Sequence, residues 1–132
     1  MFTITVQDVG AGVVRRAYSS HPVDYPVSGT KPLQRDGWSR IVLEQGKIFI
    51  ANSTAEFAPF FPDHALINRL GCHSAINVPV IEGGQVLGTV NVLDEAGHFT
   101  VARVAALTKL FAERHGELVA AMQATPMGPD AE

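Results

Sequence analysis

The strongest local pattern of hydrophobic and polar positions lies between Gly71 and Glu95. Two runs rich in valine, isoleucine and leucine, residues 74–81 and 85–93, flank the pair Gly83-Gly84. Paired glycines supply the two positive φ angles that a tight hairpin turn needs. The pattern predicts two antiparallel strands joined by this turn. Because both runs are apolar on each face, we expect them to form the centre of a sheet that is covered on both sides.

A second hairpin is predicted at the start of the chain. Residues 2–6 alternate apolar and polar, and an extended pattern resumes at residues 13–18 after a turn with two glycines. Residues 19–33 hold three prolines and no periodicity, which indicates a long irregular segment. Segments of this kind are usually functional or mobile.

Short helices are predicted in the middle of the chain. Asp36 can cap one that contains Trp38, a residue we expect to anchor this helix to the core. A short strand follows at residues 47–51, and a capping box at residues 53–56 predicts another brief helix. The next helix, residues 62–70, opens with proline, which is favourable at an early helical position.

One long helix is predicted from Val101 to about Ala124, capped by Thr100. Apolar residues recur along it at steps of three and four, which indicates one buried face. This stripe consists of Val104, Leu107, Phe111, Leu118 and Met122. The last residues, 125–132, contain two prolines and no apolar stripe, so we expect a disordered tail.

Composition limits the class of protein. A chain of 132 residues that is 46% hydrophobic suits one globular domain, here residues 1–124. The net charge is −3, from 10 basic and 13 acidic residues without a run of either sign, so we expect no nucleic-acid or membrane partner. The single cysteine, Cys72, excludes an internal disulfide and favours a cytoplasmic location.

Two asparagines in the central hairpin are candidates for a binding site. Asn77 and Asn91 stand where a purely structural strand would hold apolar residues. A strict two-residue turn would put them on opposite faces, whereas a one-residue bulge would set them opposite each other and toward the same pocket. The spacing leaves both alternatives open, and an amide in a sheet can also simply bond the backbone.

Aromatic residues and a histidine complete the candidate site. Tyr25 in the irregular segment and Phe61 with His64 before the next helix could wall a concave site for a small organic ligand. The alternative is that both aromatic side chains only fill the core. The histidines show no paired ligand spacing, and adjacent Cys72 and His73 point to opposite faces in a strand, so no metal site is predicted.

The order of these elements resembles a GAF domain. The residues that carry the resemblance span most of the chain and are Gly37-Trp38, Gly46 with Ile48-Phe49-Ile50, Phe61-Pro62-Asp63, Val78-Pro79-Val80, Gly88 with Asn91-Val92-Leu93, and Phe99-Thr100. The resemblance implies an α+β fold, an α/β/α sandwich of the profilin-like type. Its central antiparallel sheet would have about five or six strands with helices on both faces and a ligand pocket under the middle helices.

The sequence departs from the family in one respect. GAF domains usually begin with a helix that packs beside the last one, whereas here the first predicted strand starts almost at Met1. We therefore expect either a truncated version of a longer product or a neighbour that covers the exposed flank. The apolar face of Phe2, Ile4 and Val6, with a final helix of roughly 33 Å, predicts a homodimer through the C-terminal helix.

Three functions are compatible with the resemblance. The first is a non-catalytic sensory domain that binds a small molecule of unknown identity, and the second is a dimerising scaffold without a ligand. The third is a redox enzyme of the free methionine sulfoxide reductase type, which relies on several cysteines where this chain has one. Bilin attachment and cyclic-nucleotide binding require motifs that are only fragmentary here. No catalytic residues are predicted, and the cofactor is unknown.

Overall fold

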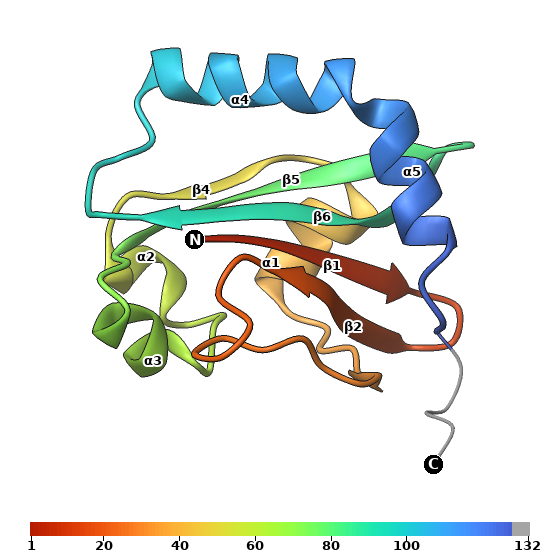
Figure 1. Ribbon diagram of the computed structural model, residues 1–132, viewed down its shortest axis with the longest axis horizontal. Helices are drawn as coiled ribbons and strands as arrows, with labels where there is room; N and C mark the ends of the chain where they lie inside the picture. The colour runs from red at the N-terminus through yellow and green to blue at the C-terminus, as the bar shows by residue number, and fades with distance from the viewer. Residues whose placement is uncertain (128–132) are drawn as a thin grey trace.

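The structure is a computed structural model in which residues 1–127 are described. Within that range the strands form one antiparallel six-stranded sheet in the order β3-β2-β1-β6-β5-β4 (Figure 1). The strands are β1 (Phe2–Asp8), β2 (Val13–Ser19), β3 (Lys31–Pro32), β4 (Phe49–Ala51), β5 (Ser74–Glu82) and β6 (Gln85–Asp94). The expected α+β fold is confirmed, and the two hairpins lie side by side at the centre through the β1–β6 pairing.

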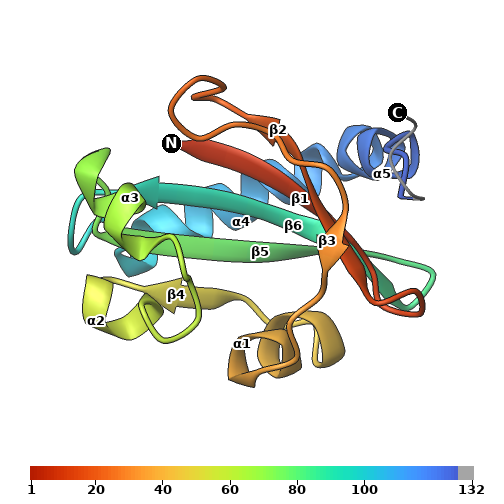
Figure 2. The ribbon, with the colours of Figure 1, turned by 90° about the horizontal axis from the view of Figure 1, so that it is seen from below.

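Helices cover both faces of the sheet. Figure 1 shows α4 (Val101–Glu113) and α5 (His115–Gln123) on one side. On the other side lie α1 (Gly37–Ser39), α2 (Thr54–Phe57) and α3 (His64–Arg69), which Figure 2 brings in front of the sheet together with β3. Two apolar clusters correspond to these layers, one around Ile76 and Phe111 and one around Phe57 and Ile67.

The turn between β5 and β6 has the predicted glycines, with φ of 59° at Gly83 and 77° at Gly84. The pairing of the two strands shifts by one residue between Val80 and Ile81. Such a bulge changes which side chains stand opposite each other in the rest of the hairpin. Beyond it, Asn77 pairs with Asn91, which is the second of the two alternatives left open by the sequence.

The first short helix is capped as predicted. The Asp36 carboxylate accepts a hydrogen bond from the Ser39 amide, and the Ser39 hydroxyl accepts one from the Asp36 amide. The helix continues as a π-helical segment, η1 (Arg40–Glu44), and Gly46 follows with a φ of 64°. The expected capping box at Ser53 does not form, because its side chain makes no capping bond and Glu56 accepts from the Asn52 amide instead.

The prediction of one continuous C-terminal helix was wrong. The helix is interrupted at Arg114, whose φ of −101° and ψ of 13° are not helical. A straight helix of the predicted length, roughly 33 Å, would extend beyond the edge of a small sheet. The bend brings α5 into contact with β5 and β6 (Figure 1). As a result, the residues Phe111 before the bend and Met122 after it are both buried against the sheet.

The same packing corrects the premise of the dimer prediction. The face of Phe2, Ile4 and Val6 was expected to need a neighbour, but it packs against the predicted helix stripe of its own chain. The rings of Phe2 and Phe111, for example, lie 6.4 Å apart. The apolar stripe is therefore already used within the chain, and the homodimer itself stays a prediction.

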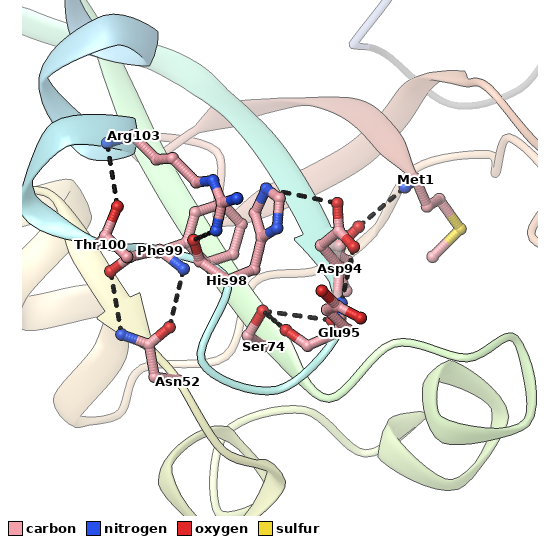
Figure 3. A network of polar contacts seen from close by, with 10 residues as sticks. Met1, Asn52, Ser74, Asp94, Glu95, His98, Phe99, Thr100 and Arg103 are labelled. Atoms are coloured by element: carbon pink, nitrogen blue, oxygen red, sulfur yellow. Dashed lines mark hydrogen bonds and ion pairs between the residues drawn. The ribbon is translucent and has the colours of Figure 1, made fainter.

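The connection from β6 to α4 is fixed by side chains (Figure 3). Asn52 accepts a hydrogen bond from the Phe99 amide at 2.9 Å and donates one to the Phe99 carbonyl at 3.1 Å. The Ser74 hydroxyl donates to the Glu95 carbonyl at 2.6 Å, and Arg103 donates to the His98 carbonyl at 3.0 Å. The start of α4 is thus held in place relative to β4 and β5.

The expected tail begins in contact with the sheet. Arg15 donates a hydrogen bond to the Pro126 carbonyl, and Met127 packs against the core cluster under α5. Residues 128–132 of the expected tail lie outside the described residues. Among residues 1–127, no helix has the length and apolar character needed to cross a membrane.

Candidate functional site

An open pocket of about 400 Å³ lies on the face of the sheet that α4 and α5 leave uncovered. Its floor is made by polar side chains of the three central strands: Thr3, Thr5, Gln7, Asn77, Thr89 and Asn91. Its walls come from α1, the irregular segment and the entry to α3, and include Tyr25, Trp38, Phe60, Phe61 and Asp63. The site therefore combines a polar floor with mainly aromatic walls.

The polar floor follows from strand geometry. Successive side chains of a strand point to opposite faces, so Thr3, Thr5 and Gln7 of β1 lie on the pocket face. The residues between them, Ile4 and Val6, face the helices α4 and α5. The register sets Thr3 opposite Asn91 and Thr5 opposite Thr89 on β6. Two strands thus contribute one continuous polar surface.

A row of hydrogen bonds crosses this floor. The Trp38 indole N–H donates to Asn77 Oδ1 at 2.9 Å, and Asn77 Nδ2 donates to Asn91 Oδ1 at 2.7 Å. Asn91 Nδ2 then donates to the hydroxyls of Thr3 and Thr5, each at 3.0 Å. We call this row, from Trp38 to Thr5, the amide ladder. It joins helix α1 to three strands and shows that both asparagines face the pocket.

Two buried polar atoms beside the ladder have no hydrogen-bond partner within the described chain. They are Gln7 Oε1 and Thr89 Oγ1, in residues that are 6% and 1% exposed. Buried polar groups are nearly always hydrogen-bonded, and leaving one unpaired costs about 1–3 kcal/mol. Sequence reasoning missed both residues. For Gln7 the signal was the polar half of the alternation in β1, which solvent exposure would have explained equally well, whereas Thr89 lies in a run of β6 that was predicted to be apolar on both faces.

Tyr25 closes one end of the pocket. Its hydroxyl donates a hydrogen bond to the Asp63 carboxylate, and the Arg16 guanidinium lies 3.7 Å from the centre of its ring. Arg16 also lies 3.6 Å from Asp63. Burial, together with the neighbouring Asp63 charge, raises the pKa of Tyr25. The irregular segment is thereby attached to the start of α3.

Phe61 and Trp38 form parts of the wall, whereas His64 does not. Phe61 lines the pocket and stacks on buried Phe57 with ring centres 5.3 Å apart. Trp38 was expected to anchor its helix in the core, but it is only half-buried, lines the pocket and bonds Asn77. The His64 ring bonds the Phe61 carbonyl at 2.8 Å and lies outside the pocket lining.

Cys72 lies apart from the pocket lining. Its side chain is 5% exposed, and burial raises the pKa of the thiol, which disfavours the reactive thiolate. Neighbouring His73 contacts the Thr54 hydroxyl at 3.3 Å. Across residues 1–127, no group of three or more histidine, cysteine or acidic side chains could hold a metal ion.

The sequence model of the GAF domain matches residues 3–113. The chain belongs to the GAF domain family. This match extends from the first strand through α4 and so contains every residue of the amide ladder. No curated protein matches the chain.

Solved structures share the fold of this GAF domain at low sequence identity. The GAF domain of a two-component sensor histidine kinase from Bacillus halodurans is 12% identical, with a TM-score of 0.68 over 90% of this chain and 80% of the other. The GAF domain of an Acinetobacter phosphoenolpyruvate-protein phosphotransferase is 15% identical, with a TM-score of 0.64 over 96% and 75%. A free methionine-R-sulfoxide reductase from Neisseria meningitidis, in complex with its substrate, is 18% identical, with a TM-score of 0.53 over 94% and 68%.

Proposed function

We propose that this GAF domain is a non-catalytic sensory module that binds a small molecule in the pocket above the amide ladder. The observation that carries the proposal is the pair of unpartnered polar atoms, Gln7 Oε1 and Thr89 Oγ1, beside a pocket of about 400 Å³. Pockets with aromatic walls and a few convergent polar groups are typical of small-ligand sites. A bound ligand would supply the missing hydrogen bonds.

The scaffold alternative accounts less well for the pocket. A domain that served only for dimerisation would gain stability by filling this space with its own apolar side chains. Here the floor instead carries amides and hydroxyls under an open volume. Two of these groups, Gln7 Oε1 and Thr89 Oγ1, have no partner in the empty protein and lower its stability, and a bound ligand would give them partners.

The enzyme alternative is supported by the fold of one neighbour but not by the site. A redox enzyme needs an accessible thiolate and a partner that resolves the oxidised sulfur. Cys72 is the single cysteine of the chain, is buried and has a raised pKa. The amide residues of the pocket offer no nucleophile, and the Tyr25 hydroxyl, which contacts Asp63, has a raised pKa that disfavours its reactive anion.

The proposal includes a route from the pocket to the C-terminal helices. Asn91 lies on β6, and β6 leads directly into α4 through the connection held by Asn52 and Phe99. The opposite face of the same strand, at Val90, packs against the cluster that contains Phe111. A small change in the ladder on ligand binding would therefore reach α4 through one strand.

We further propose that the domain acts in the cytoplasm as a homodimer through its C-terminal helices.

Ligand binding can be tested with Trp38, which is the single tryptophan of the chain and lies in the pocket wall. The low-molecular-mass fraction of an extract from the source cells should change the Trp38 emission and raise the melting temperature by several degrees, because a ligand that binds only the folded state stabilises it. Absence of both effects in the wild-type protein would contradict the proposal.

Two variants provide the controls. Val14→Phe places a ring in the pocket without removing a side-chain hydrogen bond, and it should abolish both effects. Val13→Phe makes the same change on the adjacent residue, whose side chain points to the other face of β2, and it should retain them. A response that survives in Val14→Phe would show that the ligand binds elsewhere.

A further inference from the structure

The end of the pocket beside Thr5 defines the chemistry of the ligand more closely. Thr89 lies directly opposite Thr5, and Gln7 is two residues further along β1 on the same face. Diagonal neighbours of this kind have Cα atoms roughly 7–8 Å apart. A ligand group with two polar atoms, each forming a hydrogen bond of about 2.9 Å, can therefore bridge Gln7 Oε1 and Thr89 Oγ1.

The floor carries no charge. Its side chains are threonine, asparagine and glutamine, and all of them are buried or half-buried. Of the charged residues in the lining, Arg16 and Asp63 contact each other and Tyr25, and Asp36 caps α1. The fourth, Lys31, is solvent-exposed on the edge strand β3. An ionised ligand group on the buried floor would lose its hydration without gaining a buried counter-charge. The group bound there must therefore be neutral.

The two unpartnered atoms are both satisfied by a group that combines a donor with an acceptor. Gln7 Oε1 is an acceptor, and the Thr89 hydroxyl can donate as well as accept. An amide-type group places an N–H beside a C=O and so matches both. An amide-type ligand also matches if the side-chain amide of Gln7 is reversed. The Gln7 NH₂ then donates to the ligand C=O, and the Thr89 hydroxyl accepts from the ligand N–H.

We infer that the pocket takes a neutral ligand in which an amide or lactam group is attached to a flat apolar ring. The ligand N–H donates to Gln7 Oε1, its C=O accepts from the Thr89 hydroxyl, and the ring lies against Trp38 and Phe60. The inference rests on the proposed function and specifies the ligand class of the same site. It follows from the two unpartnered atoms, the uncharged floor and the aromatic wall.

Three probes of nearly the same shape separate charge from size. Benzamide is neutral, benzoate is an anion and benzamidinium is a cation, and all three carry the same ring. Each is titrated into ¹⁵N-labelled protein while the side-chain amide signals of Gln7 and Asn77 and the single indole signal of Trp38 are followed. Benzamide should shift these signals and bind at least tenfold more tightly than either ion.

Substitutions test the two contacts separately. Thr89→Val keeps the shape but removes the hydroxyl, so benzamide should bind up to tenfold more weakly. The melting temperature of the free protein should rise, because the lost hydroxyl had no partner. Gln7→Glu should reverse the preference toward benzamidinium by introducing a carboxylate. Thr108→Val, on α4 across the sheet, should change none of these results.

The outcomes distinguish this inference from the proposed function. Tighter binding of benzoate or benzamidinium with shifts at Trp38 would overturn the neutral amide class while still supporting a ligand site. Unchanged benzamide affinity in Thr89→Val and an unchanged preference in Gln7→Glu would overturn the assigned contacts. Signal changes confined to residues outside the pocket, or none with any probe, would also overturn the inference. The proposed function would then be tested independently by adding the cell extract to the wild type and to Val14→Phe, as described above.

Discussion

Asn77 donates a hydrogen bond of 2.7 Å to Asn91 across the β5–β6 pair. The bond lies at the centre of the amide ladder, with the Trp38 indole on one side and two threonine hydroxyls on the other. Both asparagines are buried, at 5% and 7% exposed. The helix over the pocket is therefore connected to its floor by a single chain of polar contacts.

The ladder should be energetically coupled. Asn77→Ala and Asn91→Ala should each lower the free energy of unfolding by about 1–3 kcal/mol, because each leaves buried groups unpaired. The double variant should be less destabilised than the sum of the two, with a coupling energy of roughly 0.5–3 kcal/mol. Urea unfolding of the four proteins measures this cycle. Strict additivity would mean that the two amides act independently.

Tyr25 should make the protein sensitive to alkaline pH. Burial and Asp63 raise the pKa of Tyr25, so the folded state keeps a proton that the unfolded chain releases near pH 10. This contribution to stability is complete below about pH 10 and is lost as the pH rises above it. The free energy of unfolding measured from pH 9 to 11.5 should therefore fall less steeply in Tyr25→Phe than in the wild type.

The matched control for this effect is Tyr18→Phe. Tyr18 is 49% exposed and is the other tyrosine of the chain. Its substitution should leave the alkaline slope of the wild type unchanged. Equal slopes in Tyr25→Phe and the wild type would show that the Tyr25–Asp63 contact has no effect on alkaline stability.

Cys72 should be unreactive in the folded protein. Burial raises the pKa of its thiol and also blocks access to the sulfur. Reaction with a water-soluble disulfide reagent at pH 8 should be at least about a hundredfold slower than in denaturant. Cys72→Ser should leave the response of Trp38 to ligand unchanged. Rapid labelling of the folded protein would reopen the redox alternative.

The homodimer prediction can be separated from folding by two adjacent residues. Phe111 is buried against Phe2, so Phe111→Ala should destabilise the fold by about 3–5 kcal/mol whatever the oligomeric state. Leu110 is 46% exposed on the outer side of α4. If the C-terminal helices form the dimer, Leu110→Asp should yield folded monomers in sedimentation experiments. A wild-type protein that sediments as a monomer at high micromolar concentration would contradict the dimer.

Local patterns predicted most of the fold. The hairpin at Gly83-Gly84 and the cap at Asp36 follow from glycine conformation and carboxylate capping, both of which act over a few residues. The break at Arg114 was not predictable in this way, because the apolar period continues through it. The break lets α5 pack on β5 and β6, which are contacts between segments far apart in the sequence.

The candidate site was predictable only in part. Asn77 and Asn91 stood out because amides are unusual in apolar strands, and Tyr25 and Phe61 because they flank irregular segments. Their pairing depended on the bulge at Val80, which the sequence does not specify. Gln7 was missed, because a polar residue in an alternating strand is normally solvent-exposed, and here a layer of loops and helices covers that face. Thr89 was missed, because it lies in a run that was interpreted as apolar on both faces.

Native mass spectrometry of the protein, purified gently from its source cells, can detect a ligand that stays bound above the amide ladder. We predict that the wild type and Val13→Phe carry the same additional small mass, and that Val14→Phe, with its pocket filled, lacks it. The released molecule should be neutral near pH 7. A wild-type protein that carries no added mass, or a Val14→Phe protein that keeps it, would contradict a ligand site above the amide ladder.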